Sequence, residues 1–554
     1  MYDYNEKYRL WLEKATDEEV KNQLEKMSGD ESAIKESFYR DLSFGTAGLR
    51  GELGAGTNCL NIYTIRKATQ GVAECMKAHG HTTASVSCDS RINSYLFART
   101  TAEVFASNGI KTYITRELMP TPFLSYLTRY TKSQIGVMIT ASHNPAKYNG
   151  YKVYGSDGCQ LTDDYANEMT DYIEKIDAFS VVTKTVEDYE KCGLIEYVGD
   201  EVIESYLTEV KAHSTASAQG IKVTFTPLNG AGYKLVPEIL RRMEVDKIDI
   251  VTEQAQPDGN FPTCVYPNPE KAETLALGLE YVAKNGSDIL IATDPDCDRV
   301  GIAVPVSDGY RLMTGNEVGV LLTDYLLKIK SESGTLPNKP VIVKTIVTSE
   351  LVTQVAQPYG AQIYDVLTGF KYIGDVIAKL ERKNEENRYV LGFEESYGYL
   401  SGTYVRDKDA VNASMLIAEM TAYYKKLGKT LVDRLNEIYA QYGLYEHKQV
   451  RFDFPGSAGI ALMNEILMSV RDNLPTAIAG EKVVKTVDYL TQDEFDLPPS
   501  NVLSFSMADG SKLIMRPSGT EPIVKVYLTA CKDKESNAVK FSEMTAWLNS
   551  IFVK

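Results

Sequence analysis

A serine, a histidine and a lysine occur close together in one segment whose residue types could support nucleophilic chemistry. Residues 140–145 read TASHNP, and the segment YNGYK that follows ends in Lys152. A serine hydroxyl such as that of Ser142 can carry a phosphoryl group covalently, which divides one difficult transfer into two easier ones. Lys152 can hold the charge of a phosphate, or shuttle the hydroxyl proton if its pKa is lowered. Taken alone, the segment is better explained as a turn, because Asn-Pro initiates turns and Ser caps helices.

Three carboxylates at alternate positions after an apolar run form a second candidate site. They are Asp294, Asp296 and Asp298. Such a cluster is costly unless a cation neutralises it, and its oxygen ligands suit Mg²⁺, which completes its shell with phosphate oxygens or water. An EF-hand loop would need Gly and Glu where the sequence has Arg299 and Pro305. A solvated acidic turn stays open, and so does an aspartyl nucleophile, although the latter would make Ser142 redundant.

Glycine-bearing loops further along the chain carry groups that orient a polyol. The sequence GFEESYG contains Glu394 and Ser396, and carboxylates commonly accept hydrogen bonds from adjacent sugar hydroxyls. Residues 368–372 (TGFKY) add a turn with a lysine, and residues 406–409 (RDKD) add mixed charge. A pair of glutamates is by itself more often a solvated surface feature, so this interpretation depends on the other loops.

Near the C-terminus, residues 516–522 (RPSGTEP) combine a guanidinium, two hydroxyls and a glycine. Together with exposed N–H groups, these can surround a dianionic phosphate. Lys525 follows on the next predicted strand, and Arg50, Arg91 and Arg299 add positive charge. A structural turn stays open, but it would not need all of these groups at once.

The composition describes a large acidic protein that can bind anions only where positive charge is concentrated locally. Its 554 residues, 44% of them hydrophobic, favour about three to five domains. The formal net charge of −16 argues against a general nucleic-acid binder. No apolar run approaches the roughly 20 residues that span a bilayer, and the first residues lack the pattern of a secretory signal. The eight cysteines form no CxxC pair, so we expect a cytoplasmic protein in a reducing environment.

The order of apolar runs predicts α/β architecture. Residues 1–40 have apolar residues at helical spacing, and after them short β-branched runs end in polar loops that lead into helical stretches. In such folds the loops at the carboxyl ends of the strands commonly build the ligand site. The expected strands are 84–88, 135–139, 221–225, 289–292, 341–343 and 450–454. A polar linker is expected at 213–220.

Together, these loops resemble the motifs of the α-D-phosphohexomutase family, which includes phosphoglucomutases and phosphomannomutases. The motifs occur in the family's order as FGTAGLRG at 44–51, TASHNP at 140–145, DPDCDR at 294–299, GFEES at 392–396 and RPSGTEP at 516–522. The first motif and the N-terminal helical segment resemble the longer phosphoglucomutase and phosphopentomutase branch. The resemblance implies an α/β protein with four domains around a central cleft, three related mixed α/β domains and a smaller C-terminal α+β domain. The implied domains are 1–208 with the phosphoserine loop, 209–314 with the metal-binding loop, 315–444 with the sugar-binding loop and 445–554 with the phosphate-binding loop.

The resemblance also implies roles for individual residues by motif match. Ser142 would be the phosphoserine and a metal ligand, and the remaining ligands of Mg²⁺ would be Asp294, Asp296 and Asp298. The residues that assist transfer would be Arg50, Lys152 and His143. The substrate-binding residues would be Thr368, Gly369, Lys371, Glu394, Ser396, Lys408 and Arg299, with Arg516, Ser518, Gly519 and Thr520 for the phosphate that does not react.

The activity implied by the resemblance is the interconversion of α-D-glucose 1-phosphate and glucose 6-phosphate. It would proceed through phosphoserine, with glucose 1,6-bisphosphate as intermediate and activator. Mannose phosphates are alternative substrates, since a grip on O3 and O4 does not sense the configuration at C2, and pentose phosphates are a further alternative within the class. A metal-dependent phosphatase and a non-catalytic sugar-phosphate sensor are the alternatives from other classes. The implied partners are small sugar phosphates, with no nucleic acid and no membrane, and the implied state is a monomer or dimer.

One position departs from the family pattern. Some bacterial relatives end the sugar-binding loop in Gly-His, whereas this sequence has Gly398-Tyr399. If that histidine is an acid or base elsewhere, another group must replace it here. Lys152, Lys371 and Lys408 are the candidates.

Overall fold

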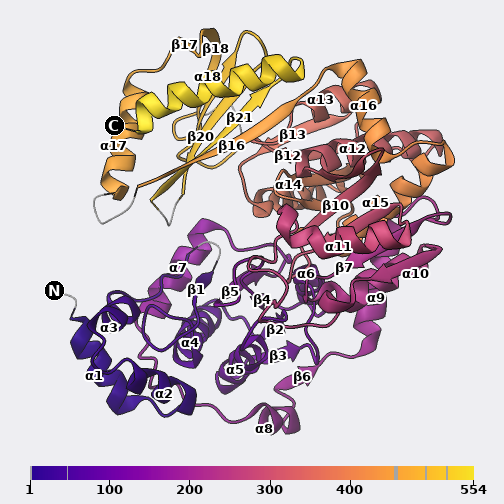
Figure 1. The fold of residues 1–554 in the computed structure, drawn as a ribbon. Helices are drawn as coiled ribbons and strands as arrows, with labels where there is room; N and C mark the ends of the chain where they lie inside the picture. The colour runs from indigo at the N-terminus through magenta and orange to yellow at the C-terminus, as the bar shows by residue number, and fades with distance from the viewer. Residues whose placement is uncertain (1–2, 46–47, 455–458, 493–495, 519–521, 554) are drawn as a thin grey trace.

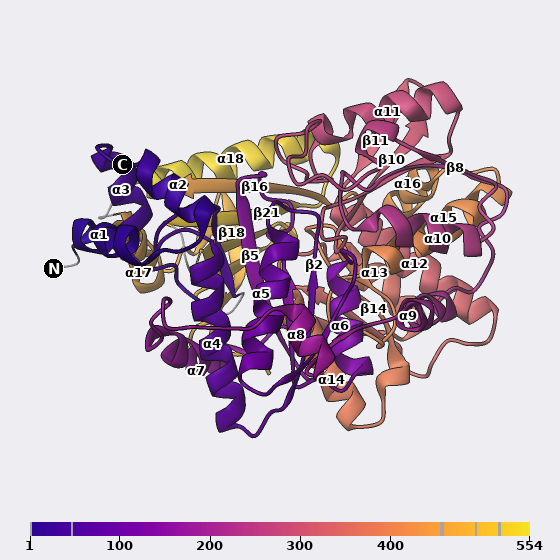
Figure 2. The same cartoon turned by 90° about the horizontal axis from the view of Figure 1, so that it is seen from below.

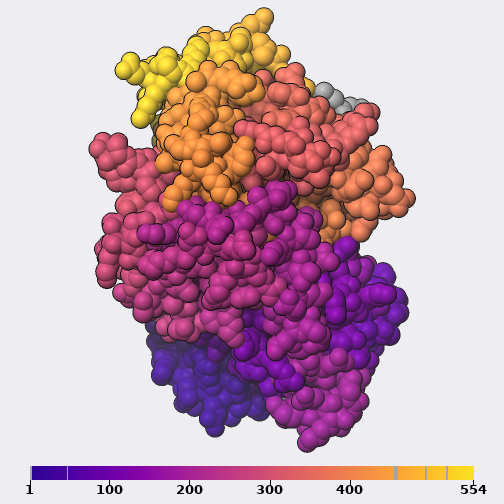
Figure 3. Space-filling view, turned by 90° about the vertical axis from the view of Figure 1, so that its right-hand side faces the viewer, coloured from indigo at the N-terminus to yellow at the C-terminus, as the bar shows by residue number. Residues whose placement is uncertain are grey.

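The molecule is built on four β-sheets that follow one another along the chain (Figure 1). The structure is a computed structural model and describes residues 3–45, 48–454, 459–492, 496–518 and 522–553. In the space-filling view, the segments are stacked from the indigo N-terminal part to the yellow C-terminal part (Figure 3). Within the described ranges, no helix is both long and apolar enough to cross a bilayer.

Three short helices precede the first sheet, where the sequence analysis predicted helical structure over 1–40. They are α1 (Tyr4–Lys14), α2 (Glu18–Lys26) and α3 (Glu31–Phe38). The side chains of Asp17 and Asp30 each accept a hydrogen bond from a backbone N–H three residues further on, so each begins a new helix. The helices enclose an apolar cluster in which the rings of Trp11 and Phe38 lie 5.7 Å apart, edge to face.

The first sheet has the strand order β1-β5-β4-β2-β3-β6. Its elements are β1 (Leu49–Glu52), α4 (Ile62–Ala78), β2 (Thr83–Cys88), α5 (Ser94–Ser107), β3 (Lys111–Ile114), α6 (Thr121–Tyr130), β4 (Ile135–Ile139), β5 (Tyr148–Gly155), α7 (Asp163–Glu174), α8 (Val186–Lys191) and β6 (Ile195–Tyr197). Helices α5 and α6 pack against its central strands, as the view from below shows (Figure 2). Helix α9 (Asp200–Ala212) then leads out of this part of the molecule.

The second and third sheets have the orders β11-β10-β9-β7-β8 and β13-β12-β14-β15. The second contains β7 (Lys222–Thr226), α10 (Gly232–Arg242), β8 (Lys247–Ile250), α11 (Ala272–Asn285), β9 (Ile289–Thr293), β10 (Val300–Val306) and β11 (Gly309–Met313). The third contains α12 (Gly315–Glu332), β12 (Val341–Thr345), α13 (Leu351–Ala356), β13 (Gln362–Val366), α14 (Phe370–Arg382), β14 (Tyr389–Glu394), β15 (Gly398–Leu400), α15 (Ala410–Lys426) and α16 (Leu431–Tyr442). The predicted linker at 213–220 contains neither helix nor strand.

The same four-strand unit recurs in the first three sheets. A central strand has a parallel neighbour on each side, and the second of these neighbours turns back into an antiparallel strand. The units are β3-β2-β4-β5, β8-β7-β9-β10 and β13-β12-β14-β15. The hairpin loops of the three units are residues 140–147, 294–299 and 395–397. The predicted serine, acidic and sugar-binding loops therefore occupy equivalent positions in three repeated units.

The fourth sheet is antiparallel throughout, in the order β16-β21-β20-β19-β18-β17. Its elements are β16 (Glu446–Asp453), α17 (Gly459–Asp472), β17 (Ala477–Ile478), β18 (Glu481–Asp488), β19 (Leu503–Met507), β20 (Lys512–Pro517), β21 (Ile523–Ala530) and α18 (Lys534–Phe552). Helix α18 lies along one face of the sheet (Figure 1). This α+β unit has an apolar core of its own, which includes Phe505, Val526 and Leu548.

The predicted architecture of three related mixed α/β domains and a smaller C-terminal α+β domain is confirmed. Each expected strand is present within a few residues, and the largest difference is β16, which begins at Glu446 rather than at residue 450. The implied domain boundaries stay a prediction, because the apolar core is not divided at each of them. Buried residues of the second and third sheets form one continuous cluster, whereas the first and fourth sheets have separate clusters.

Candidate active site

The hairpin loops of the three repeated units each contain a non-glycine residue in the left-handed region. These residues are Ser142 (φ 53°), Cys297 (φ 51°) and Tyr397 (φ 68°). Side chains rarely adopt this conformation because of steric strain, and strained residues are concentrated at functional sites. Other non-glycine residues of the described chain also have positive φ, but the three equivalent loops share this feature with one another.

The first two loops meet at Ser142, whose side chain is almost fully buried. Its Oγ donates a hydrogen bond to Oδ2 of Asp294 over 2.9 Å and lies 3.1 Å from Nδ1 of His143. Its backbone N–H donates to the Thr140 hydroxyl over 2.8 Å. Burial, with the nearby charges of Arg299 and Arg50, lowers the pKa of His143 well below its usual value, so this imidazole is neutral. The serine is therefore held between an acidic group and a neutral imidazole.

The buried side chain of Arg91 supports the serine loop through hydrogen bonds to its backbone carbonyls. The Arg91 guanidinium donates to the backbone carbonyl of Ser142 over 2.6 and 3.2 Å, and also to those of Asn144, Pro145 and Tyr148. The Arg91 backbone N–H donates to the Asp89 carboxylate, which also lies 3.6 Å from the guanidinium. The sequence analysis counted Arg91 only as local positive charge, since its reach back to residues 142–148 depends on the pairing of β2 with β4.

The acidic loop is a buried cluster with the features of a cation site. One carboxylate oxygen each from Asp294, Asp296 and Asp298 lies within 4.8 Å of the others, and all three side chains are buried. Oδ1 of Asp294 accepts the backbone N–H groups of Asp298 and Arg299, over 3.1 and 3.0 Å. Oδ1 of Asp296 and Oδ1 of Asp298 have no hydrogen-bond partner within the described part of the chain. Buried carboxylate oxygens of this kind fit the ligand set of Mg²⁺.

The pKa shifts of the three aspartates also favour a cation site. Burial and the neighbouring carboxylates raise the pKa of both Asp294 and Asp298. Burial alone would also raise the pKa of Asp296, but Lys152 beside it holds that pKa well below its usual range. Like charges in a low-dielectric site are unfavourable unless cations lie among them.

Two lysines from different domains lie against this cluster. Nζ of Lys152, on β5, is 2.9 Å from Oδ2 of Asp296 and 3.8 Å from Oδ2 of Asp298. Nζ of Lys408, on the loop before α15, is 3.0 Å from Oδ2 of Asp298 and 3.0 Å from Asp407. Burial opposes their charge, but the carboxylates raise the pKa of both lysines. The carboxylates therefore favour the charged form of Lys152, which fits a cation that holds the charge of a phosphate.

The predicted sugar-binding loop is tied to the turn at Gly369. Oε1 of Glu394 accepts the backbone N–H of Gly369 over 2.8 Å, and the hydroxyl of Thr368 has no hydrogen-bond partner among the described residues. Glu395, which the sequence analysis gave no role of its own, accepts the hydroxyl of Thr345 over 3.0 Å. Burial, together with the charge of Glu394, raises the pKa of Glu395 to about 7. Ser396 lies in the same loop and is partly exposed.

The remaining predicted residues are spread around these loops. Lys371 forms an ion pair with Asp163 of the first domain. Arg299 contacts Glu270 over 2.9 Å, and Arg50 is exposed on β1. Arg516 lies on β20, where its charge acts on Glu395, and Ser518 directly follows that strand. Gly519 and Thr520 lie outside the described residues.

Tyr399, the residue after Gly398 in the predicted sugar-binding loop, is a packing residue. It is buried, its ring stacks on Phe393 at a centroid distance of 6.1 Å, and its hydroxyl donates to the carbonyl of Gly315 over 3.1 Å. Its pKa is raised well above the usual value by burial. It therefore cannot replace a histidine acid or base.

Thr121, at the start of α6, is a further neighbour of the acidic loop that the sequence analysis missed. It donates its backbone N–H to the Asp296 carbonyl over 2.8 Å and its hydroxyl to Oδ2 of the same residue over 3.0 Å. Nothing in the sequence around it suggests this contact, since 175 positions separate the two residues.

Comparison with known proteins agrees with this multidomain α/β fold. Family descriptions of phosphoglucomutase/phosphomannomutase alpha/beta/alpha domains I, II and III match residues 41–179, 204–307 and 314–442, and that of the C-terminal domain matches 468–544. The chain belongs to the phosphoglucomutase/phosphomannomutase family.

Individual relatives extend over nearly the whole chain. A phosphoglucomutase of Staphylococcus saprophyticus is 35% identical over 536 residues, which are 94% of this chain and 96% of that protein. A phosphoglucomutase of Staphylococcus aureus is 35% identical over 553 residues, with 97% and 98% covered. The solved structure of parafusin, a phosphoglucomutase from Paramecium, has a TM-score of 0.68 at 17% identity and covers 93% of this chain and 96% of its own. A family protein from Burkholderia thailandensis has a TM-score of 0.69 at 17% identity, with 92% and 97% covered. The two structures support the fold.

The contacts of Arg91 predict that Arg91→Lys disturbs the serine loop although the charge is kept. A single ammonium cannot replace a planar guanidinium that reaches several carbonyls at once. Since a misplacement of about 1 Å can cost roughly 100-fold in rate, we expect the turnover of glucose 1-phosphate to fall by about that factor, with little change in KM. Arg116→Lys, at an exposed position, is the control and should keep normal turnover. Normal turnover of Arg91→Lys would contradict this role.

The raised pKa of Glu395 predicts a pH-dependent effect on stability. Between pH 4.5 and about 7 the unfolded chain loses this proton while the folded chain keeps it, so stability is lost as pH rises through that window. Glu395→Gln removes the effect. We expect the variant to gain about 2–3 kcal/mol relative to the unmodified protein at about pH 8, and nothing at about pH 4.

The comparison requires thermal unfolding midpoints at both pH values. Glu280→Gln, at an exposed position whose glutamate has no such partners, is the control. A difference for Glu395→Gln that is the same at both pH values would show that Glu395 does not titrate in this way.

Proposed function

We propose that this protein is a phosphoglucomutase that interconverts α-D-glucose 1-phosphate and glucose 6-phosphate through a phosphorylated Ser142. The observation that carries the proposal is the 2.9 Å contact between Oγ of Ser142 and Oδ2 of Asp294, which joins a buried nucleophile to a buried acidic cluster. Relatives named phosphoglucomutase, at 35% identity over nearly the whole chain, support the choice of glucose phosphates.

In the proposed cycle, phosphorylated Ser142 gives its phosphoryl group to the free hydroxyl of a glucose monophosphate. The bond from Ser142 Oγ to phosphorus breaks, a bond from the sugar oxygen to phosphorus forms, and the proton of the sugar hydroxyl passes to a base. The product, glucose 1,6-bisphosphate, turns around, and its other phosphate returns to Ser142. Each half reaction is a phosphoryl transfer, in which positioning and charge neutralisation supply most of the catalysis.

Asp294, Asp296 and Asp298 would hold Mg²⁺, with an oxygen of phosphorylated Ser142 as a further ligand. When bound there, Mg²⁺ supplies neutralisation of the charge on the transferring phosphate. Lys152 and Lys408 already lie against these carboxylates and would hold the phosphate oxygens on the same side. Arg50 and His143 would assist from the serine side, since the neutral imidazole of His143 lies within hydrogen-bond distance, 3.1 Å, of Ser142 Oγ.

The sugar and its second phosphate would be bound mainly by the third and fourth domains, with Arg299 from the second. We propose that Thr368, Gly369, Lys371, Glu394, Ser396 and Arg299 bind the sugar, and that Arg516, Ser518, Gly519 and Thr520 bind the phosphate. The hydroxyl of Thr368 has no hydrogen-bond partner among the described residues, and the next residue, Gly369, donates its N–H to Glu394. Both observations support the assignment of this turn to sugar binding. The position of Arg516 on β20, where its charge reaches Glu395, supports the assignment of the phosphate-binding residues.

The proposal includes the domains 1–208, 209–314, 315–444 and 445–554, a cytoplasmic location, and a monomer or dimer. Phosphomannomutase and phosphopentomutase activities are the alternatives within the class. A metal-dependent phosphatase would release free phosphate, and a sensor would bind sugar phosphates without converting them. Incubation with Mg²⁺, a trace of glucose 1,6-bisphosphate and the 1-phosphate of glucose, mannose or ribose separates these outcomes by product. Conversion of glucose 1-phosphate to its 6-phosphate at the highest rate is the expected result.

Ser142→Ala tests the phosphoryl carrier directly. Loss of a nucleophile that acts together with its neighbours typically costs many powers of ten, so we expect turnover to fall by roughly 10³-fold or more. Ser156→Ala, in the exposed turn after β5, should keep normal turnover. EDTA should abolish the activity of the unmodified protein, and added Mg²⁺ should restore it. Near-normal turnover of Ser142→Ala, or indifference to EDTA, contradicts the proposal.

A further inference from the structure

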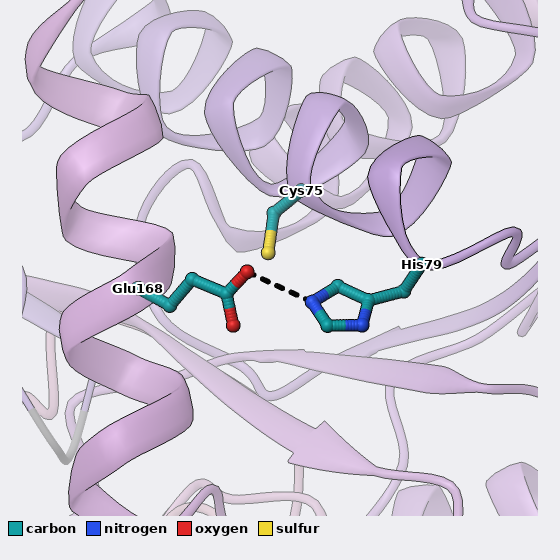
Figure 4. A group of neighbouring side chains, drawn as sticks. All are labelled: Cys75, His79 and Glu168. Carbon is teal, nitrogen blue, oxygen red and sulfur yellow. Dashed lines mark hydrogen bonds and ion pairs between the residues drawn. The ribbon is translucent and has the colours of Figure 1, made fainter.

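A second group of ligand-type side chains lies between α4 and α7, away from the loops of the candidate active site. Cys75 and His79 stand four residues apart at the end of α4, and Glu168 is on α7. The thiol sulfur, an imidazole nitrogen and a carboxylate oxygen all lie within 4.8 Å of one another. Nε2 of His79 is 2.8 Å from Oε1 of Glu168. Figure 4 shows the three side chains pointing toward one another from the two helices.

The two helices are held close together by a glycine. A Cβ placed on Gly71 of α4 would lie 2.5 Å from the Cα of Ile173 on α7, so no larger residue fits there without displacing a helix. The glycine is one helical turn before Cys75. The two helices therefore lie close together near the cluster.

The cluster combines one buried ligand side chain with two partly exposed side chains that can change rotamer. The thiol of Cys75 is buried, whereas the side chains of His79 and Glu168 are 43% and 42% exposed. The exposed pair can therefore rotate toward an ion that arrives from solvent. His81 adds a nitrogen donor beside the group, since its ring centroid is 5.7 Å from that of His79 and its Nδ1 is 3.5 Å from the Tyr165 hydroxyl.

We propose that Cys75, His79 and Glu168 form a Zn²⁺ site that clips α4 to α7. A tetrahedral zinc ion has bonds of about 2.3 Å to sulfur and about 2.0–2.2 Å to nitrogen and oxygen, which places its ligand atoms roughly 3–4 Å apart. Small rotations of His79 and Glu168 reach that spacing from the present one. On binding, the thiol proton passes to solvent, and bonds to the ion replace the contact between the imidazole and the carboxylate.

The ligands Cys75, His79 and Glu168 favour Zn²⁺ over Mg²⁺, which is the ion proposed for the candidate active site. Thiolate and imidazole ligands suit zinc and similar borderline cations, whereas Mg²⁺ binds oxygen ligands. The fourth tetrahedral position is open to His81 or to water. The competing explanation is a simple ion pair between His79 and Glu168 beside a buried thiol, and this explanation predicts no bound metal.

The test uses the full chain in excess Mg²⁺, which fills the oxygen-ligand site. Titration with Co²⁺ alone as a probe should give the sulfur-to-cobalt absorption band of a thiolate ligand, at one equivalent per chain. Competition with Zn²⁺ should remove the band and report the zinc affinity. Loss of even a supporting group costs a metal site roughly 10–100-fold in affinity, so we expect His79→Gln and Cys75→Ser each to weaken zinc binding by about 100-fold or more.

Two matched variants serve as controls. Cys192→Ser removes an exposed thiol far along the chain, and Lys77→Gln changes an exposed neighbour on α4. Both should retain the cobalt band and the zinc affinity. Absence of the band in the unmodified protein overturns the proposal, and so does a band that survives in both His79→Gln and Cys75→Ser.

A second readout does not depend on spectroscopy or on sugar-phosphate turnover. An ion that binds only the folded chain raises the thermal unfolding midpoint, and more ion raises it further. In excess Mg²⁺, Zn²⁺ should therefore raise the midpoint of the unmodified protein and of Cys192→Ser but not that of His79→Gln. An equal rise of the unfolding midpoint in all three proteins would show that zinc binds at another site, and would overturn the assignment. Because no residue of this site belongs to the proposed active site, failure of one proposal leaves the other intact.

Discussion

Three buried carboxylates beside a buried serine are the constraint around which the domains are arranged. Negative charge in a low-dielectric interior is unfavourable by several kcal/mol for each ion unless partners compensate it. Here the compensating groups come from other domains: Lys152 comes from the first and Lys408 from the third. Asp407 extends the network, since it contacts Lys408 and accepts the hydroxyl of Tyr154 over 2.9 Å. The same charges that would make the acidic loop costly in isolation thus join three domains at one place.

Repetition of one topology explains how three loops from distant parts of the sequence can serve this site. In each of the first three domains the loop follows the outer strand of a parallel trio and turns back into an antiparallel strand. The loops emerge at carboxyl ends of parallel strands, where α/β folds usually bind ligands. Positive φ angles at Ser142, Cys297 and Tyr397 show that each turn is tight, and the packing of the strands on either side maintains the strain.

The contacts between neighbouring domains differ in how much apolar core they share. The second and third share one apolar core, whereas the fourth contacts the third through a small cluster that includes Ile346, Leu367 and Ile514. An ion pair of 2.8 Å between Lys512 and Glu350 adds to this contact. Small, partly polar interfaces between domains commonly permit relative motion. The fourth domain is therefore the part of the molecule best suited to move relative to the third.

The sequence by itself determined which loops contain the candidate site residues. The acidic loop, the serine loop and the alternation of strands and helices could all be predicted, because each depends on residues close together in the chain. Only the tertiary structure decided the contacts that support these loops: Arg91 with the serine loop, Thr121 with Asp296, Glu395 with Thr345, and the burial of Tyr399. These depend on strand pairing and domain packing between residues up to 175 positions apart, and local residue patterns carry no record of such contacts. The two roles that the sequence left open for Lys152 also depend on tertiary structure, since folding brings to it the carboxylates that raise its pKa.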